Sequence, residues 1–252
     1  MFAFTPPFVP MADVSMSLES EGFALLSPED FSSVTQHSLN EWDSLQAHWE
    51  NLPSDDYLKD GGHYRRRRHA SIIIRNKHIE SVKERPHWQP VSYNALHGGI
   101  DRWFAPCESA FLDNEAFKAL VLELGGLFCN VKNIDPNTNP WFVEVHQFRI
   151  DTKEGIGRPT PEGAHRDGVD FVAVLLVDRH HIKGGETRIF SANGPQGQRF
   201  TLTRPWTLVL LDDVKVIHET TPIQPESNNL DDAWRDTLVL TYRLKNFQDK
   251  NP

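Results

Sequence analysis

The sequence predicts an α+β protein, mainly β, whose core is a sandwich or jelly roll with supporting N-terminal helices. Two observations carry this prediction. Helical periodicity is confined to the part before residue 130, and beyond Pro140 the chain is a series of short β-rich segments separated by Gly, Pro, Asn and Asp. Helices followed by many closely spaced strands are typical of a sheet structure covered on one face by helices.

The N-terminal elements follow from local signals. Residues 22–26 are predicted to form a short strand, and a helix should begin at 27–30, where Ser, Pro, Glu and Asp supply an N-cap, a first-turn proline and early acidic positions. A second helix is predicted over 39–52 from large apolar residues spaced three to four apart. These residues are Trp42, Leu45, Trp49 and Leu52.

A hairpin around 70–74, with a turn near Asn76 and Lys77, precedes a third predicted helix over 114–128, whose end Gly125 and Gly126 should weaken. Seven strands are then predicted, over 141–150, 169–177, 187–190, 200–202, 207–211, 214–218 and 237–242. We find no internal repeat, so one domain over 15–252, behind a flexible tail of residues 1–14, is the simplest organisation.

Composition limits the possible functions. The chain has 252 residues, 38% of them hydrophobic, and a net charge of −9, which opposes non-specific binding of nucleic acid. No apolar run approaches the roughly 18 residues of a membrane-spanning helix, and the N-terminus is not typical of a secretory signal, so we expect a cytoplasmic protein with no membrane partner. Cys107 and Cys129 are too few for a disulfide framework or a zinc cage, and should be buried thiols.

The candidate metal ligands are His165, Asp167 and His218. On an extended strand the side chains of residues i and i+2 share a face, so His165 and Asp167 can reach one ion. With His218 they make two imidazoles and one carboxylate, the set associated with non-haem Fe(II) oxygenases.

The His-x-acid spacing occurs by chance about twice in a chain with 12 histidines and 35 acidic residues, so its context decides. His48 and Glu50 lie in a predicted helix, where they point in divergent directions. His78 and Glu80 follow a polar turn and should lie at the surface. His165, by contrast, leads from a glycine-containing loop into the apolar segment 171–177.

An arginine could bind the distal carboxylate of a 2-oxo acid cosubstrate, and Arg235 and Arg243 are the candidates. The odd positions of residues 235–243 should line a polar pocket. If this strand and the His218 strand form an antiparallel hairpin, Arg235 lies opposite His218 and Arg243 about 26 Å further along. We therefore expect Arg235 to bind the cosubstrate, helped by Thr237. A surface ion pair of Arg235 with Asp231 or Asp232 is the alternative.

The ordered motifs resemble the 2-oxoglutarate/iron dioxygenase family that contains L-isoleucine 4-hydroxylases and BsmA-like proteins. The resemblance covers most of the chain. It rests on Tyr93-Asn94, Gly98-Gly99, Arg102, residues 145–150, residues 165–169, residues 184–187, Asp212-Asp213 through His218, and Arg235-Asp236.

This resemblance implies a double-stranded β-helix, the cupin-like jelly roll, with Fe(II), 2-oxoglutarate and O₂. It also implies hydroxylation of an unactivated C–H bond, often in a free amino acid, with release of succinate and CO₂. Three protein ligands on octahedral iron leave three positions, enough for a bidentate 2-oxo acid and O₂.

For the substrate, Gln147 and Arg149 share a strand face and are predicted to bind an amino-acid carboxylate; a sheet-edge amide and a surface arginine are equally compatible with the pattern. The run Arg65, Arg66, Arg67, Arg68 could feed the same pocket from a loop, mark a nucleic-acid patch or be a solvated face.

Three rival functions stay open at this point. A cupin-like enzyme could use the same three ligands without a 2-oxo acid, and the role of Arg235 separates it from an oxygenase. A non-catalytic binding domain would show no turnover. An oxygenase for nucleic acid or protein would need an open groove instead of a closed pocket. The identity of the amino acid, the position hydroxylated and the oligomeric state, such as a dimer, are not encoded in any pattern that we can read.

Overall fold

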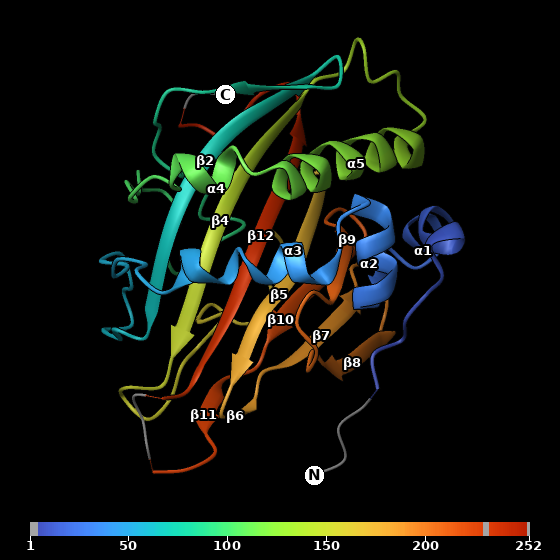
Figure 1. Ribbon diagram of the computed structural model, residues 1–252. Helices are drawn as coiled ribbons and strands as arrows, with labels where there is room; N and C mark the ends of the chain where they lie inside the picture. Colours follow the sequence, from blue (N-terminus) through green and yellow to red (C-terminus); the bar gives the residue numbers. More distant parts are fainter. Residues whose placement is uncertain (1–4, 229–231, 251–252) are drawn as a thin grey trace.

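A computed structural model describes residues 5–228 and 232–250. Its main feature is a seven-stranded antiparallel sheet (Figure 1). In spatial order the strands are β1 (Phe23–Leu26), β9 (Leu208–Asp212), β5 (Phe171–His180), β12 (Trp234–Leu244), β4 (Trp141–Asp151), β2 (Arg65–Arg75) and β3 (His78–Ser81).

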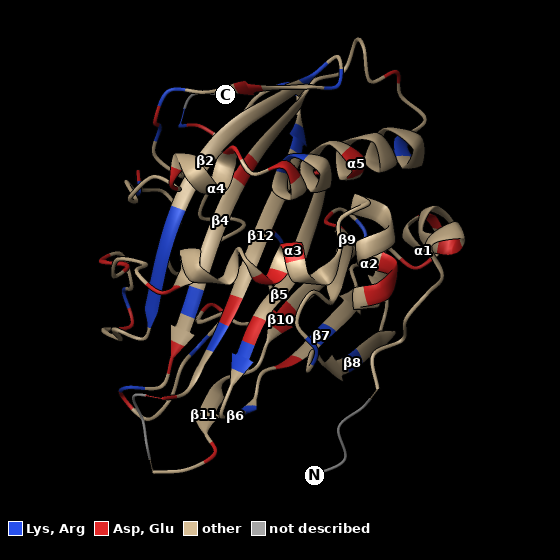
Figure 2. Cartoon of the chain, viewed as in Figure 1, with Lys and Arg blue, Asp and Glu red and all other residues tan. Residues whose placement is uncertain are grey.

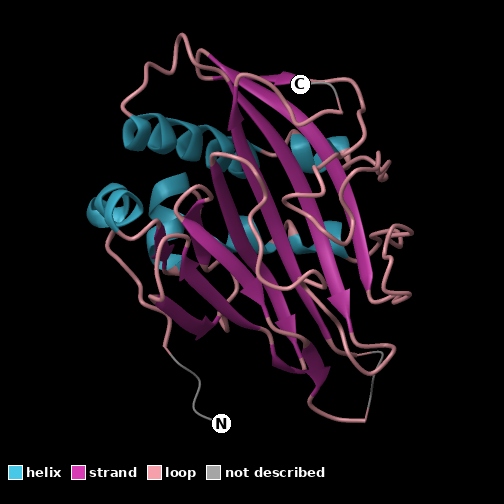
Figure 3. Cartoon of the chain, turned by 180° about the vertical axis from the view of Figure 1, so that it is seen from behind, coloured by secondary structure: helices cyan, strands magenta, loops and turns pink. Residues whose placement is uncertain are grey.

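A smaller sheet packs behind the large one and is seen best from the back (Figure 3). Its strands are β10 (Val216–Thr220), β7 (Glu186–Ser191) and β8 (Gly197–Thr201), and a short pair, β11 (Ile223–Pro225) with β6 (Ile182–Gly184), lies nearby. Two facing antiparallel sheets confirm the predicted mainly-β jelly roll.

The helices cover the opposite face of the large sheet (Figure 1). The longest is α5 (Glu115–Lys132), and the others are α1 (Val14–Ser20), α2 (Pro28–Thr35), α3 (Leu39–Asp43) and α4 (Ser109–Leu112), with 3₁₀ turns η1 (Met11–Asp13) and η2 (Gln46–Trp49). No helix within the described ranges is both long enough and apolar enough to cross a membrane.

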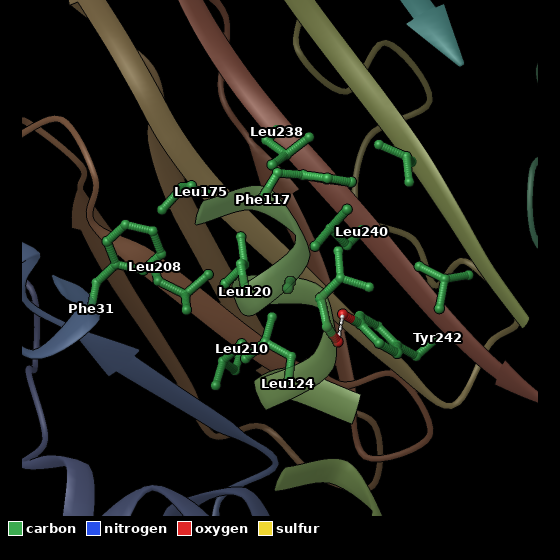
Figure 4. Close-up of a cluster of buried hydrophobic side chains, with 14 of the residues drawn as sticks. Phe31, Phe117, Leu120, Leu124, Leu175, Leu208, Leu210, Leu238, Leu240 and Tyr242 are labelled. Atoms are coloured by element: carbon green, nitrogen blue, oxygen red, sulfur yellow. Dashed lines mark hydrogen bonds between the residues drawn. The ribbon is translucent and has the colours of Figure 1, made fainter. Parts of the chain in front are cut away.

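The main hydrophobic core lies between α5 and the large sheet (Figure 4). Leu120 and Leu124 of α5 meet strand residues such as Leu175, Leu210 and Leu240, all of which are buried. In the same layer, the hydroxyl of Tyr242 donates a hydrogen bond to the backbone oxygen of Val121 (3.0 Å). One face of each central strand thus packs in the core, and the other face is available for different contacts, because alternate side chains point to opposite faces.

The other face of the large sheet meets the small sheet. A second apolar cluster fills one part of this interlayer space, with Leu176 and Val209 from the large sheet against Ile189, Phe200 and Val216. The polar cavity described below occupies another part, and Val174 and Val239 border both. The polar cavity therefore lies between the two sheets, away from the helices.

Several local predictions are confirmed. The side chain of Ser27 caps α2 by accepting a hydrogen bond from the backbone N–H of Asp30 (3.1 Å). Asn76 and Lys77 adopt positive φ angles at the turn between β2 and β3, as a two-residue hairpin turn requires. Both cysteines are buried free thiols.

Other boundaries differ from the predictions. The helix expected over 39–52 is split into α3 and η2, although its four large apolar residues are buried as predicted. Helix α5 continues past Gly125 to Lys132, because Gly125 lets the helix pack closely on Ile74 and Trp141. Of the predicted tail, residues 11–13 form η1 and Val14 is fully buried; residues 1–4 lie outside the described residues.

The predicted hairpin between the His218 and Arg235 strands is wrong. Strand β10 pairs with β7 in the small sheet, whereas β12 lies between β4 and β5 in the large sheet. Residues 221–233 are too long a connection for a tight hairpin, and part of them forms β11, which pairs with β6. Between Asp236 and Thr237 the pairing of β12 with β5 shifts register, a bulge beside the residues that enter the cavity.

Truncation of the core should show which layer carries stability. We expect Leu120→Ala, at a fully buried position, to lower the free energy of unfolding by about 2–5 kcal/mol, because it leaves a cavity between α5 and the sheet. Leu122→Ala, at a partly buried position of the same helix, is the matched control and should cost clearly less. Urea denaturation measures both, and equal losses would contradict the assignment of the core.

Candidate metal centre and cavity

His165 and His218 form a directly opposed backbone pair. The N–H of His165 donates to the oxygen of His218 (3.0 Å), and the N–H of His218 donates back to the oxygen of His165 (2.9 Å). His165 lies in this isolated bridge ahead of β5, and His218 lies in β10. The residues opposite His218 are thus His165 on one edge of β10 and Ile189 of β7 on the other, not Arg235 as the sequence suggested.

The side chains of His165, Asp167 and His218 converge. One ligand atom from each lies within 4.8 Å of the others, and the Asp167 carboxylate oxygens lie 3.8 Å from Nε2 of His165 and 3.4 Å from Nε2 of His218. Nδ1 of His165 is 3.0 Å from the carbonyl oxygen of Gly163, which can only accept, so Nε2 presents a lone pair to the site.

These residues fit a divalent metal ion. Two imidazole nitrogens and a carboxylate oxygen form a donor set for non-haem iron, and the site is open on one side to the cavity. Among the described residues, Nε2 of His218 is buried without a hydrogen-bond partner, as expected for an atom whose partner is a metal.

A neighbouring carboxylate holds Asp167 in place. The side chain of Asp213 accepts hydrogen bonds from three successive backbone N–H groups, those of Asp167 (2.9 Å), Gly168 (2.7 Å) and Val169 (3.1 Å). Gly168 has a φ of +77°, and a Cβ there would lie 2.5 Å from the ring of Tyr93. Only glycine therefore suits the turn that follows Asp167.

The charges of the site interact strongly. Burial alone would raise the pKa of Asp167, but the imidazoles of His218, whose Nε2 lies 3.4 Å away, and of His165 hold it well below its usual range. Burial opposes protonation of His165, yet Asp167 and Glu162 raise the pKa of its imidazole. Burial and the charge of Asp167 raise the pKa of Asp213. The site thus offers excess negative charge to a cation.

The cavity beside these ligands lies between the two sheets. The space between its lining atoms is about 850 Å³, with its mouth and the solvent in front of it included. The odd face of β12 lines it, as predicted, through Arg235, Thr237, Val239 and Thr241.

Arg235 is buried without a counter-charge. It is only 3% exposed, and neither its Nε nor its Nη2 finds a partner in the part of the chain that the structure describes. Burial and the nearby Arg179 lower the pKa of Arg235 to about 10. Arg243 lies elsewhere and bonds the backbone oxygens of Asn246 and Phe247. The structure therefore brings Arg235 and Thr237, but not Arg243, to the cavity that contains the three convergent residues.

Gln147 and Arg149 do not reach this cavity. The even positions of β4, His146, Phe148 and Ile150, line it. Arg149 forms a bidentate pair with Asp236 (2.8 and 2.6 Å), a residue on the even, helix-facing side of β12. Gln147 is fully buried on the same face of β4 as Val145, a residue of the main core. Their predicted role in binding the substrate carboxylate therefore has no support from this cavity, because strand parity turns both side chains away from it.

The arginine run belongs to β2 rather than to a loop (Figure 2), and its residues alternate between buried and partly buried positions. Arg65 and Arg67 are buried and line the cavity. Arg66 contacts Asp151 (3.3 Å), and Arg68 contacts Glu108 (3.4 Å). Half of the run therefore belongs to the site, and the other half to partly exposed ion pairs.

A second group of potential ligands adjoins the cavity, which His87 and His146 line; its other members are His69 and Glu144. Here Glu144 is bonded by Arg85 (3.2 Å) and by Nδ1 of His87 (3.0 Å), and Arg67 lies 2.6 Å from Nδ1 of His146. Two guanidinium groups already supply positive charge, so we interpret the group as a polar network that positions His87 and His146, not as a metal site.

A jelly roll with two histidines and one aspartate converging beside a polar cavity is typical of mononuclear non-haem metalloenzymes. Comparison with protein families makes this specific, because the model for 2OG-Fe dioxygenases matches residues 46–241. The chain belongs to this 2OG-Fe dioxygenase family and is a 2-oxoglutarate-dependent dioxygenase that uses Fe(II), 2-oxoglutarate and O₂, as the resemblance implied.

Solved structures agree with this assignment. A bsmA homolog from Methylobium petroleophilum PM1 is 47% identical, with a TM-score of 0.90 and 99% of each chain covered. IDO from Bacillus thuringiensis (23% identity, TM-score 0.76, covering 93% of this chain and 99% of that one) shares the fold. The Fe(II)/α-ketoglutarate-dependent dioxygenase TqaL also shares the fold, with 18% sequence identity and a TM-score of 0.71, covering 95% of this chain and 88% of that one. A search of curated proteins gave no match.

The Asp213 contacts predict an indirect effect on metal binding. Asp213→Asn loses acceptor capacity for the three N–H groups that fix the turn after Asp167, so we expect Fe(II) affinity to fall about 10- to 100-fold. Asp212→Asn, which changes the adjacent carboxylate, is the matched control. Anaerobic metal titration measures both variants, and unchanged affinity in Asp213→Asn would exclude this role.

The buried histidines predict a loss of stability in acid. Burial lowers the pKa of His87 to about 4, against about 6.5 in an unfolded chain, so below pH 6.5 the unfolded state binds more protons. We expect His87 to account for a loss of about 2 kcal/mol between pH 7.5 and 5.

Urea unfolding of the metal-free protein across this pH range measures the effect. His87→Gln should flatten the pH profile by that amount, whereas His78→Gln, at an exposed site, should leave it unchanged. A profile that is equally steep in His87→Gln would assign the acid sensitivity to other groups.

Proposed function

We propose that the protein hydroxylates a free L-amino acid, with Fe(II) on His165, Asp167 and His218 and 2-oxoglutarate on Arg235. The observation that carries this proposal is the buried, unpaired guanidinium of Arg235 in the same cavity as the three convergent ligands. A planar guanidinium can bind a carboxylate through two parallel hydrogen bonds.

The position of Arg235 supports a role in cosubstrate binding. A buried cation without a carboxylate partner is unfavourable by itself, and an anionic ligand supplies the missing partner. Thr237, two residues along the same strand, adds a hydroxyl on the same face. The distal carboxylate of 2-oxoglutarate would then be held by Arg235 and Thr237, while its 2-oxo acid end faces the metal ligands.

The bound iron supplies the activation of O₂ that couples decarboxylation of 2-oxoglutarate to succinate and CO₂ with insertion of oxygen into a C–H bond. The chain's own contribution is to position both molecules and to exclude water from them. Lining residues such as Phe148, Ile150 and Val174 are apolar and suit an aliphatic side chain.

A small zwitterionic substrate fits the cavity better than a polymer does. The lining includes cationic groups, such as Arg102, and an anionic group, Glu162, in one space between the sheets. A nucleic-acid groove differs from it in shape, because such a groove presents phosphate-binding cations along an extended surface. The cavity thus supports a free amino acid as the substrate class.

The cosubstrate assignment is tested at Arg235. Arg235→Ala should raise the KM for 2-oxoglutarate by about 10- to 100-fold, because a charge-assisted bidentate contact is lost. Arg243→Ala, on the same strand but outside the cavity, is the matched control and should behave like the unchanged protein. Succinate release measures both, and an unchanged KM in Arg235→Ala would rule out the assigned contact.

The substrate class is tested by a panel of the twenty L-amino acids with Fe(II), 2-oxoglutarate and O₂. At least one should stimulate succinate release above the substrate-free rate and gain 16 Da, as detected by mass spectrometry. Stimulation by none of them would reject the amino-acid proposal while leaving the family assignment intact.

A further inference from the structure

The cavity wall formed by β2 and residues 87–102 carries more positive charge than its protein partners balance. Arg65, Arg67 and Arg102 all line the cavity and are at most 6% exposed. Arg65 contacts Asp55 at 2.7 Å and Arg67 lies 3.8 Å from the same carboxylate oxygen, so one acid serves two guanidinium groups. The wall therefore lacks an anion.

Arg102 is the least satisfied of the three. One of its terminal nitrogens donates to the side-chain oxygen of Gln89 (2.9 Å), and its Nε is buried without a partner. Within residues 5–228 and 232–250 it forms no ion pair of 4.0 Å or less. Burial and the charge of Arg65 lower the pKa of Arg102 to about 10, which agrees with a missing counter-charge.

The surroundings of Arg102 fix both its position and its distance from the metal ligands. Its backbone exchanges two hydrogen bonds with His87 (2.9 and 3.0 Å). Gln89, which accepts from Arg102, donates through its amide nitrogen to Asp167 (3.1 Å). Only the side chain of Gln89 thus separates the guanidinium of Arg102 from Asp167, a proposed iron ligand. A small molecule bound to Arg102 can therefore extend to the metal site.

A complementary group lies in the same cavity. Glu162 lines it, and its Oε2 is buried without a partner among the described residues, while Oε1 lies 3.6 Å from Nε2 of His165. A buried carboxylate oxygen of Glu162 and a buried Nε of Arg102 without protein partners in one cavity are both costly, and a zwitterion satisfies both at once.

We infer that Arg102 binds the carboxylate, and Glu162 the ammonium group, of an amino-acid substrate. This inference rests on the proposed function and replaces Gln147 and Arg149 as the substrate-binding residues. With both charged ends held, the aliphatic part of the substrate is directed along the apolar lining toward the metal ligands.

The test compares three probes on the Mn(II)- and 2-oxoglutarate-loaded protein under anaerobic conditions, by calorimetry. The probes are the L-amino acid most active in the panel, its carboxamide and the matching 2-hydroxy acid; for isoleucine these are L-isoleucine, L-isoleucinamide and 2-hydroxy-3-methylpentanoate. The amide lacks the carboxylate, and the hydroxy acid lacks the ammonium group.

Arg102→Gln should weaken binding of the amino acid and the hydroxy acid by about 10- to 100-fold and leave the amide unchanged. Glu162→Gln should weaken binding of the amino acid and the amide and leave the hydroxy acid unchanged. Both variants should keep the affinity for 2-oxoglutarate. Arg66→Gln, on the neighbouring face of β2, is the matched control and should change none of these affinities.

Several outcomes would overturn the inference. Equal weakening of all three probes, or of none, contradicts selective recognition, and a lost 2-oxoglutarate affinity would place Arg102 in the cosubstrate site. Reduced Mn(II) affinity in Glu162→Gln would make Glu162 part of the metal site. Circular dichroism shows whether Arg102→Gln folds. If it does not, Arg102→Lys replaces it; this variant keeps the charge but not the planar guanidinium, and it should show the same probe selectivity in weaker form. If the unchanged protein binds no amino acid, the proposed function fails first.

Discussion

The site depends on the reciprocal backbone hydrogen bonds between His165 and His218. They join the chain segment ahead of β5 to a strand of the small sheet. Two histidines that are 53 positions apart in the sequence are thereby held side by side. Asp213 adds the third constraint, because its carboxylate gathers the three N–H groups that follow Arg166. The donor set is therefore built by backbone geometry before any metal is bound, which lowers the conformational cost of metal binding.

Groups of opposite charge line the same cavity. The proposed metal ligands include the carboxylate of Asp167, whereas Arg235 and the wall that contains Arg102 hold buried positive charge with few protein partners. Such unpaired groups reduce stability in the ligand-free protein. Under the roles proposed above, the same groups select ligands whose carboxylates lie where they can pair with the guanidinium groups.

The sequence predicted the convergent residues and the polar face of β12 because both rest on period-two alternation, which survives in any sheet arrangement. It failed for Gln147 and Arg149 because β4 is buried on both faces. The odd positions of β4 are apolar in its first half, at Val143 and Val145, and polar in its second half. In sequence this resembles a strand whose second half faces a polar cavity. In β2 the four consecutive arginines are identical, so the sequence shows no alternation that would separate cavity-facing from outward-facing positions. Asp213 had no signal beyond its place in the family motif, since its partners are backbone N–H groups, which every residue but proline has.

The division of each central strand into a helix-facing side and a cavity-facing side has a consequence for how the protein can change. Positions such as Leu238 and Leu240 serve the core, and their neighbours Thr237 and Val239 serve the cavity. Substitutions on the two sides touch different partners, so their effects on stability and on substrate choice should be nearly additive. A lineage, or a directed-evolution library confined to the cavity side, can thus explore new substrates with little loss of folded protein.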